Sequence, residues 1–396
     1  MTAFWQFWRT RVPTSSTDYE KEIEHLRQKA PIPAIWLFGK TGSGKSSIIK
    51  YLTGAESTAI GEGYRPMTKT SRSFDFPDSD EPLLTFIDTR GLGEAAYDPQ
   101  TDIEQLTGST QLMVVVVKVS DHALQCILEP LRSIRKAFPH RPTLLVLTCL
   151  HEATGAIDLS EGIDPFVTAF RNPQEAPSPT ESLVIPTVLQ QLIDEKLSQF
   201  KGLYDVAIPI DLTQKTDGFA DPDFGGSRLK QSILEYLPRA YRQALLTLNK
   251  VGGRESIRQK KSRWQVLSSS ALAATAGAVP VPWVDVPVVL AIQAHLALRI
   301  AAIYEQEITP SDWALLSSAA GSRIVARMVI MEALKFIPFL GMAAGAASSF
   351  AFTYALGMSW DWYFANVRGG TVPSHDKLRE IFADQLKRGR LLWSEQ

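Results

Sequence analysis

The sequence is poor in cysteine and has no excess of charge of either sign. Its 396 residues include only two cysteines, Cys126 and Cys149, too few for the disulfide framework that stabilises many secreted domains. Basic residues number 41 and acidic residues 42, so the net charge of −1 gives no general attraction to nucleic acid. The first residues show no basic leader ahead of an apolar core, so no secretory signal is expected. We therefore expect a cytoplasmic protein, with nucleic acid not indicated as a partner.

Charge is also scarce in one long stretch. Only nine of the 97 residues from 264 to 360 are charged, against 21% of the whole chain. A chain of this length exceeds what one ordinary hydrophobic core supports. The sequence therefore predicts a polar first domain and an unusually apolar second one.

Apolar runs of strand length alternate with helix-length segments in the first part of the chain. The expected strands are an apolar run within 31–38 and the segments 72–76, 83–88, 112–119, 143–148 and 206–212. The expected helices are 122–138, 187–200 and 226–250. Such alternation is typical of an α/β fold with a mainly parallel sheet covered on both faces. After residue 251, runs rich in alanine, glycine and serine predict an all-α hydrophobic domain.

A glycine-rich loop separates the first expected strand from a helix. Residues 39–46 read Gly-Lys-Thr-Gly-Ser-Gly-Lys-Ser, the full pattern of a phosphate-binding loop. Its glycines let backbone N–H groups converge on phosphate oxygens, while Lys45 is expected to bridge the outer phosphates. The predicted nucleotide-binding residues are Gly39, Lys40, Thr41, Gly42, Ser43, Gly44, Lys45, Ser46 and Ser47.

Two further segments are expected to complete a Mg²⁺ site. Asp88, which ends a strand, is expected to hold the ion together with the Ser46 hydroxyl. Thr68, with Thr70 as the fallback, is expected to join the metal shell when a terminal phosphate is present. The predicted metal ligands are therefore Ser46, Thr68 and Asp88.

The catalytic candidates lie in the same two segments. The amide of Gly91 is expected to contact the terminal phosphate, and Thr68 to sense it. Arg90 is the nearest charged side chain that could stabilise transition-state charge, and a solvated switch residue is the alternative reading.

In their order and spacing, residues 39–47, Pro-Met-Thr at 66–68 and Asp-Thr-Arg-Gly at 88–91 resemble the small G domain of Era/TrmE-like GTPases. The resemblance covers about residues 30–245. It implies a P-loop GTPase that binds GTP or GDP with Mg²⁺ and hydrolyses GTP slowly without a partner.

The base-reading segment departs from that family. Thr148-Cys149-Leu150-His151 stands where the family has Asn/Thr-Lys-x-Asp, so cysteine replaces the lysine and histidine replaces the guanine-pairing aspartate. Thr148, Cys149 and His151 are still the predicted base-side contacts, with packing at a strand end as the alternative. Glu152 supplies a carboxylate one position late. GTP is favoured, and ATP or a relaxed specificity is the alternative.

Two uncharged runs in the second half, 264–284 and 336–360, reach the length of a membrane span, roughly 20 residues. The second contains Gly341 and Gly345 in a G-x-x-x-G pattern, which allows helices to approach closely. Charged residues such as Arg299 in the flanking helices favour a soluble bundle with a hydrophobic docking surface instead. Both readings stay open.

Segments 280–287, 292–304, 337–341 and 353–357 resemble the YcjF-type hydrophobic helical domain, whose function is poorly defined. The expected organisation is an N-terminal aromatic segment and helix (1–29), a G domain (30–250), the hydrophobic helical domain (251–373) and an amphipathic helix (374–396).

The leading hypothesis is a regulatory GTPase whose nucleotide state controls a docking domain. Its expected partners are guanine nucleotide, a membrane lipid or a protein bound through the helical domain, and a second copy of the chain. The alternatives are a constitutive membrane-associated scaffold with nucleotide-driven self-association and an NTPase of relaxed specificity.

Overall fold

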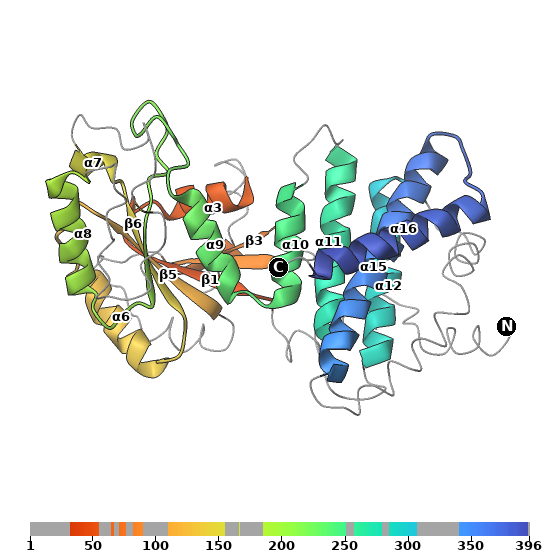
Figure 1. The fold of residues 1–396 in the computed structure, drawn as a ribbon, viewed down its shortest axis with the longest axis horizontal. Helices are drawn as coiled ribbons and strands as arrows, with labels where there is room; N and C mark the ends of the chain where they lie inside the picture. The colour runs from red at the N-terminus through yellow and green to blue at the C-terminus, as the bar shows by residue number, and fades with distance from the viewer. Residues whose placement is uncertain are drawn as a thin grey trace. The chain divides into compact units, whose positions relative to one another are not determined.

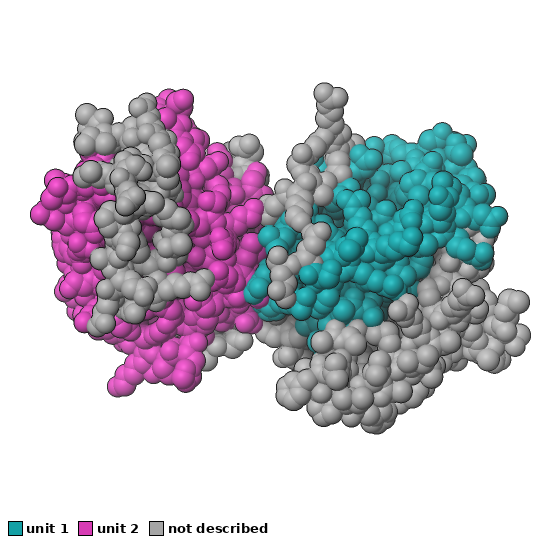
Figure 2. All heavy atoms as spheres, viewed as in Figure 1, with its two compact units in different colours: residues 1–31, 238–396 teal, residues 32–237 magenta. Residues whose placement is uncertain are grey.

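The chain divides into two compact units in its computed structural model, residues 32–237 and residues from 238 onward (Figure 2). The structure describes residues 32–54, 65–66, 71–76, 82–89, 110–154, 166, 185–250, 257–278, 285–306 and 340–394. The division falls between Leu237 and Pro238, where the stretch 226–250, expected as one helix, forms two helices.

The first unit is built on a sheet that has seven strands among the described residues (Figure 1). They are β1 (Ala34–Phe38), β2 (Arg65–Pro66), β3 (Ser71–Phe76), β4 (Leu84–Thr89), β5 (Thr110–Lys118), β6 (Thr143–Thr148) and β7 (Val206–Pro209). The spatial order is β2-β3-β4-β1-β5-β6-β7. Strands β4, β1, β5, β6 and β7 run parallel, and β2 and β3 add an antiparallel edge. This confirms the predicted α/β class with a mainly parallel sheet.

Helices cover both faces of this sheet because its central strands are apolar on both sides. Helices α6 (Gln125–Ala137) and α8 (Thr187–Gln199) share one core with alternate residues of β1, β5 and β6 (Figure 1). Helices α3 (Lys45–Thr53) and α9 (Gly226–Tyr236) adjoin each other, since a Cβ on Gly226 would meet the ring of Tyr51. The short α7 (His151–Thr154) follows β6. The carboxyl ends of the parallel strands are thereby left for loops.

The second unit is helical in its described residues. It contains α10 (Arg239–Lys250), α11 (Ile257–Gly277), α12 (Asp285–Ile303), α15 (Leu340–Arg368) and α16 (His375–Ser394). Small residues let α11 and α15 approach closely: a Cβ on Gly277 would lie 2.5 Å from the Ser349 hydroxyl and 2.9 Å from the Gly345 carbonyl oxygen. Gly345 of the G-x-x-x-G pattern therefore contacts another helix of its own chain.

Where the structure describes the apolar stretch 264–360, its helices pack against one another and against α16. Ile292 of α12 and Phe350 and Tyr354 of α15 are buried. Two polar groups pair inside the bundle, with Gln293 donating to the Thr353 hydroxyl at 3.0 Å. None of the described helices combines the length and the apolar character needed to cross a membrane.

Candidate nucleotide site

The phosphate-binding loop connects the carboxyl end of β1 to the first turn of α3. Its backbone turns through the left-handed region at Gly42 (φ 77°) and Gly44 (φ 99°), which side chains rarely allow. At Gly39 a Cβ would collide with the carbonyl oxygen of Val116 in neighbouring β5. Glycine is thus required at these positions for the loop to close over the sheet edge.

Lys45, the first residue of α3, lies folded back beneath the loop. Its ammonium donates to the carbonyl oxygens of Gly39 at 2.7 Å and Lys40 at 2.8 Å. It also lies 3.6 Å from Asp88 Oδ1, because β4 pairs with β1 in a register that sets Asp88 opposite Leu37. Burial lowers the pKa of Lys45 below its ordinary value, although Asp88 opposes that shift. A largely buried cation therefore lies where the loop would hold the outer phosphates.

Ser46 and Asp88 fit a Mg²⁺ ion by their chemistry. Both offer oxygen atoms, the donors that Mg²⁺ prefers, and Lys45 lies next to Ser46 and close to Asp88. Within the described ranges, no three His, Cys, Asp or Glu side chains gather as a metal site. A Mg²⁺ ion here would therefore need phosphate and water oxygens for most of its shell, which is how this ion is usually held beside nucleotides.

Thr148 fastens the phosphate-binding loop to the end of β6. Its buried hydroxyl donates to the Ser43 carbonyl oxygen at 2.8 Å, and its methyl group is the nearest neighbour of the position a Cβ would take on Gly44. The structure thus brings Thr148, which the sequence predicted as a base-side contact, next to the phosphate-binding loop.

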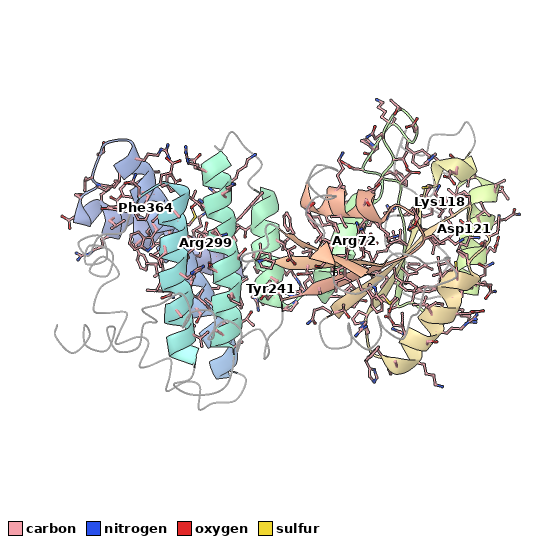
Figure 3. All side chains as sticks on the ribbon, turned by 180° about the vertical axis from the view of Figure 1, so that it is seen from behind. Arg72, Lys118, Asp121, Tyr241, Arg299 and Phe364 are labelled. Carbon is pink, nitrogen blue, oxygen red and sulfur yellow. The ribbon has the colours of Figure 1, made fainter. Side chains whose placement is uncertain are left out.

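Two ion pairs join neighbouring loops at the same edge of the sheet. Lys40 contacts Asp121, beyond β5, at 2.8 Å. Lys118, the last residue of β5, contacts Glu152 at 2.7 Å, and Ser120 also donates to that carboxylate. Figure 3 labels Lys118 and Asp121, which lie near each other at this end of the sheet. Sequence reasoning missed both residues; their position at the end of a buried strand and just beyond it was the available signal.

The Glu152 carboxylate is therefore occupied by neighbours rather than left for a base. Burial by itself raises the pKa of Glu152, but the hydrogen bonds from Lys118 and Ser120 hold it below its usual value. The substitute carboxylate suggested by the sequence is an ion-pair partner in this structure.

His151 and Asp211 link the loops that follow β6 and β7. The Asp211 side chain is fully buried and accepts hydrogen bonds from the His151 amide at 2.8 Å and the Thr213 amide at 3.1 Å. The His151 ring approaches the same carboxylate, with Nδ1 2.7 Å from Oδ2. Cys149, between Thr148 and this pair, has a left-handed backbone (φ 57°), and burial raises the pKa of its thiol although Lys118 opposes the shift.

A cavity of about 430 Å³ runs along α3, from Ser46 near its start to Gly54 just beyond its end. Ser46, Ser47 and Tyr51 line it on one side, and Leu212 and Asp223 on the other. The loop after β7 therefore adjoins the start of α3. Of the remaining predicted residues, Thr41 is exposed at the tip of the loop, whereas Thr68, Thr70, Arg90 and Gly91 lie outside the described residues.

Residues 34–149 match a family model described as a 50S ribosome-binding GTPase, which covers under a third of the chain. No curated protein matches the sequence. Together with the phosphate-binding loop and the strand order, the family match supports a G domain in this part of the chain.

Several solved structures of GTP-binding proteins align with the chain. The bacterial selenocysteine-specific elongation factor EF-Sec is 17% identical with a TM-score of 0.29, over 52% of this chain and 28% of that protein. A GTP-binding protein from the archaeon Sulfolobus solfataricus in complex with GDP is 17% identical with a TM-score of 0.27, over 59% and 60%. The G domain of the T. maritima FeoB iron transporter is 17% identical with a TM-score of 0.27, over 52% and 98%. The chain thus spans less than two thirds of the first two proteins.

Proposed function

We propose that this chain, which carries a G domain in residues 34–149, is a regulatory GTPase that binds GTP and GDP with Mg²⁺ and hydrolyses GTP to GDP. One observation carries the proposal. The cation of Lys45 lies beneath a complete phosphate-binding loop, beside Asp88 of the adjacent parallel strand. The backbone amides of a glycine-rich loop and the N-terminus of the helix that follows it form an arrangement suited to binding phosphate oxygens.

Each group of residues would have a distinct role in nucleotide binding and hydrolysis. Backbone amides between Gly39 and Ser47 bind the phosphates, and Lys45 neutralises their outer charge. Ser46 and Asp88 would hold Mg²⁺, which neutralises charge that develops between the outer phosphates. We further propose Thr68 and the Gly91 amide as sensors of the terminal phosphate, with Arg90 stabilising charge in the transition state.

We also propose that nucleotide state governs the second unit. Its stretch 264–360 carries only nine charges, which supports contact with a membrane lipid, a protein partner or a second copy of the chain. The proposal also includes the Era/TrmE-like assignment of the G domain and the YcjF-type assignment of the second unit.

The Lys45→Ala variant tests nucleotide binding. Because a charge-assisted hydrogen bond contributes about 1.5–3 kcal/mol, we expect the Kd for a fluorescent GDP or GTP analogue to rise at least about 10-fold. Lys201→Ala, at an exposed loop position, is the matched control and should bind as the unchanged protein does. Circular dichroism establishes that both variants are folded. Undiminished affinity in a folded Lys45→Ala variant would overturn the proposal.

A second candidate is an NTPase of relaxed base specificity. It is favoured by the pairing of Glu152 with Lys118 and Ser120, which engages the carboxylate that the sequence offered for base recognition. Competition between GTP and ATP for the same site separates the two functions.

A further inference from the structure

We propose that His151, oriented by Asp211, reads the base of the bound nucleotide through the single acceptor atom Nε2. The site would therefore take 6-oxopurine nucleotides as a class, with guanine and hypoxanthine accepted alike and adenine rejected. This inference rests on the proposed nucleotide binding and adds the recognition of its base.

The position of His151 follows from the arrangement of the strands. In open α/β sheets, ligands bind outside the carboxyl ends of the parallel strands, and the phosphate-binding loop occupies that edge at β1. Thr148, at the end of β6, is hydrogen-bonded to that loop through the Ser43 carbonyl oxygen. His151 follows three residues later, so a nucleotide with its phosphates on the loop has its base side among these residues.

The loop after β7 bounds the same region. Leu212, the neighbour of Asp211, lines the cavity of about 430 Å³ that also touches Ser46 and Ser47. That cavity gives a ligand anchored at the start of α3 room that extends toward the segment holding Asp211. The Thr148 hydrogen bond thus places the segment that carries His151 at the nucleotide edge, and the lining of the cavity includes Leu212, the residue next to Asp211.

Asp211 fixes which ring nitrogen of His151 carries a proton. Its carboxylate is fully buried and is held by the amides of His151 and Thr213. A carboxylate only accepts hydrogen bonds, so Nδ1, at 2.7 Å, donates, and in the neutral form of the ring the lone pair then lies on Nε2. Phe219 contacts the ring edge-to-face, which limits its rotation. Among the described residues no hydrogen bond engages Nε2.

One lone pair accepts one N–H group, and this sets the specificity. Guanine and hypoxanthine both present an N–H at ring position 1, whereas adenine presents a bare nitrogen whose lone pair would repel Nε2. A carboxylate would instead accept from the ring N–H and from the exocyclic amino group that only guanine has. Among the described residues that directly follow β5 and β6, the carboxylates of Glu152 and Asp121 are engaged by Lys118 and Lys40.

The test measures Kd values of the full-length chain for GDP, IDP and ADP by displacement of a fluorescent GDP analogue. For the unchanged protein we expect GDP and IDP to agree within about 3-fold and ADP to bind at least about 10-fold more weakly, since an unmet polar contact costs about 1–3 kcal/mol. The His151→Asp variant should gain discrimination and bind GDP at least about 10-fold more tightly than IDP, because it adds the second acceptor.

Two more variants separate a structural effect from base reading. His151→Phe keeps an aromatic ring against Phe219 and removes the acceptor, so the ADP-to-GDP ratio of Kd values should fall toward one. Asp211→Asn no longer imposes one tautomer and should lower that ratio in the same direction. His140→Gln, at an exposed position, is the matched control and should leave every ratio unchanged.

Three results would overturn the inference while nucleotide binding stands. They are a GDP preference over IDP above about 10-fold in the unchanged protein, equal affinity for all three nucleotides, and an unchanged ratio in His151→Phe. Failure of the fluorescent GDP analogue itself to bind would instead refute the proposed function and the inference together.

Discussion

Cys149 has a strained backbone conformation and lies between two contacts at the predicted base side of the site. Cys149 is half-buried and has φ 57°, between the loop-fastening Thr148 and the His151–Asp211 pair. The left-handed region costs a residue with a Cβ roughly 1–2 kcal/mol, and glycine largely escapes this cost. The strain persists because hydrogen bonds hold the residues on both sides of Cys149.

The Cys149→Gly variant is therefore expected to be as stable as the unchanged protein, or more stable by up to about 1 kcal/mol. Cys149→Val should lose about 1–2 kcal/mol, because a β-branched side chain tolerates this conformation poorly. Urea denaturation measures both free energies of unfolding. Cys126→Gly is the control: Cys126 lies in the first turn of α6, where glycine relieves no left-handed strain and lowers helix propensity by a few tenths of a kcal/mol. Equal losses for Cys126→Gly and Cys149→Gly would contradict this account.

At the scale of the elements, ion pairs fasten loops that strand pairing alone leaves separate. Lys40 follows β1 and Asp121 follows β5, and their contact at 2.8 Å joins segments 81 residues apart. Burial by itself raises the pKa of Asp121, but the hydrogen bonds from Lys40 and the Ala123 amide hold it below its ordinary value. A lowered folded-state pKa means stabilisation that is present above the unfolded pKa of about 3.9 and is lost as the pH falls through the folded value.

A double-mutant cycle of Lys40→Met and Asp121→Asn is expected to give a coupling energy of about 0.5–1 kcal/mol at pH 7. Each side chain is less than a quarter exposed, so solvent screens the pair only in part. The coupling should shrink as the pH falls below about 4. Chemical denaturation of the four proteins at pH 7 and pH 3 checks this. A coupling equal at both values would show that charge is not its source.

The elements also show which features the sequence could predict. The apolar run at 143–148 forms a strand with those same bounds, because a strand buried on both faces is marked by apolar residues throughout. The expected strand 206–212 ends at Pro209, since Asp211 turns inward to bind two amides and the His151 ring. The expected helix 226–250 breaks at Leu237, which is extended (ψ 146°) as a residue before proline prefers.

The sequence predicts which site residues lie close together only where recognisable motifs stand at the ends of adjacent strands. The closeness of Lys45 and Asp88 follows from one motif after β1 and another at the end of adjacent β4. The Lys40–Asp121 and His151–Asp211 pairs depend on the order of β1, β5, β6 and β7 in space, which no local pattern encodes. Sequence alone therefore predicts the phosphate side of the site and leaves the base side open.

At the scale of the whole molecule, a G domain acts as a switch only if nucleotide states differ in their free energy of interaction with an attached element. A ligand shifts a population only by its differential affinity for the two arrangements. The second unit contains a stretch of 97 residues with nine charges, and its described helices bury most of their apolar side chains against one another. A modest rearrangement of such helices would change the apolar surface that is exposed to a second copy or to lipid.

We therefore expect the full-length chain to differ in association between GDP and a non-hydrolysable GTP analogue, by about 10-fold in the dissociation constant. That difference needs only about 1.4 kcal/mol of coupling, within the usual range for allosteric proteins. Analytical sizing measures self-association, and sedimentation with liposomes separately measures lipid binding. Lys45→Ala is the control, because a chain that does not bind nucleotide should behave identically in both conditions. If the unchanged protein also gives identical results in both read-outs, nucleotide does not govern the second unit, and a constitutive scaffold becomes the better account of the chain.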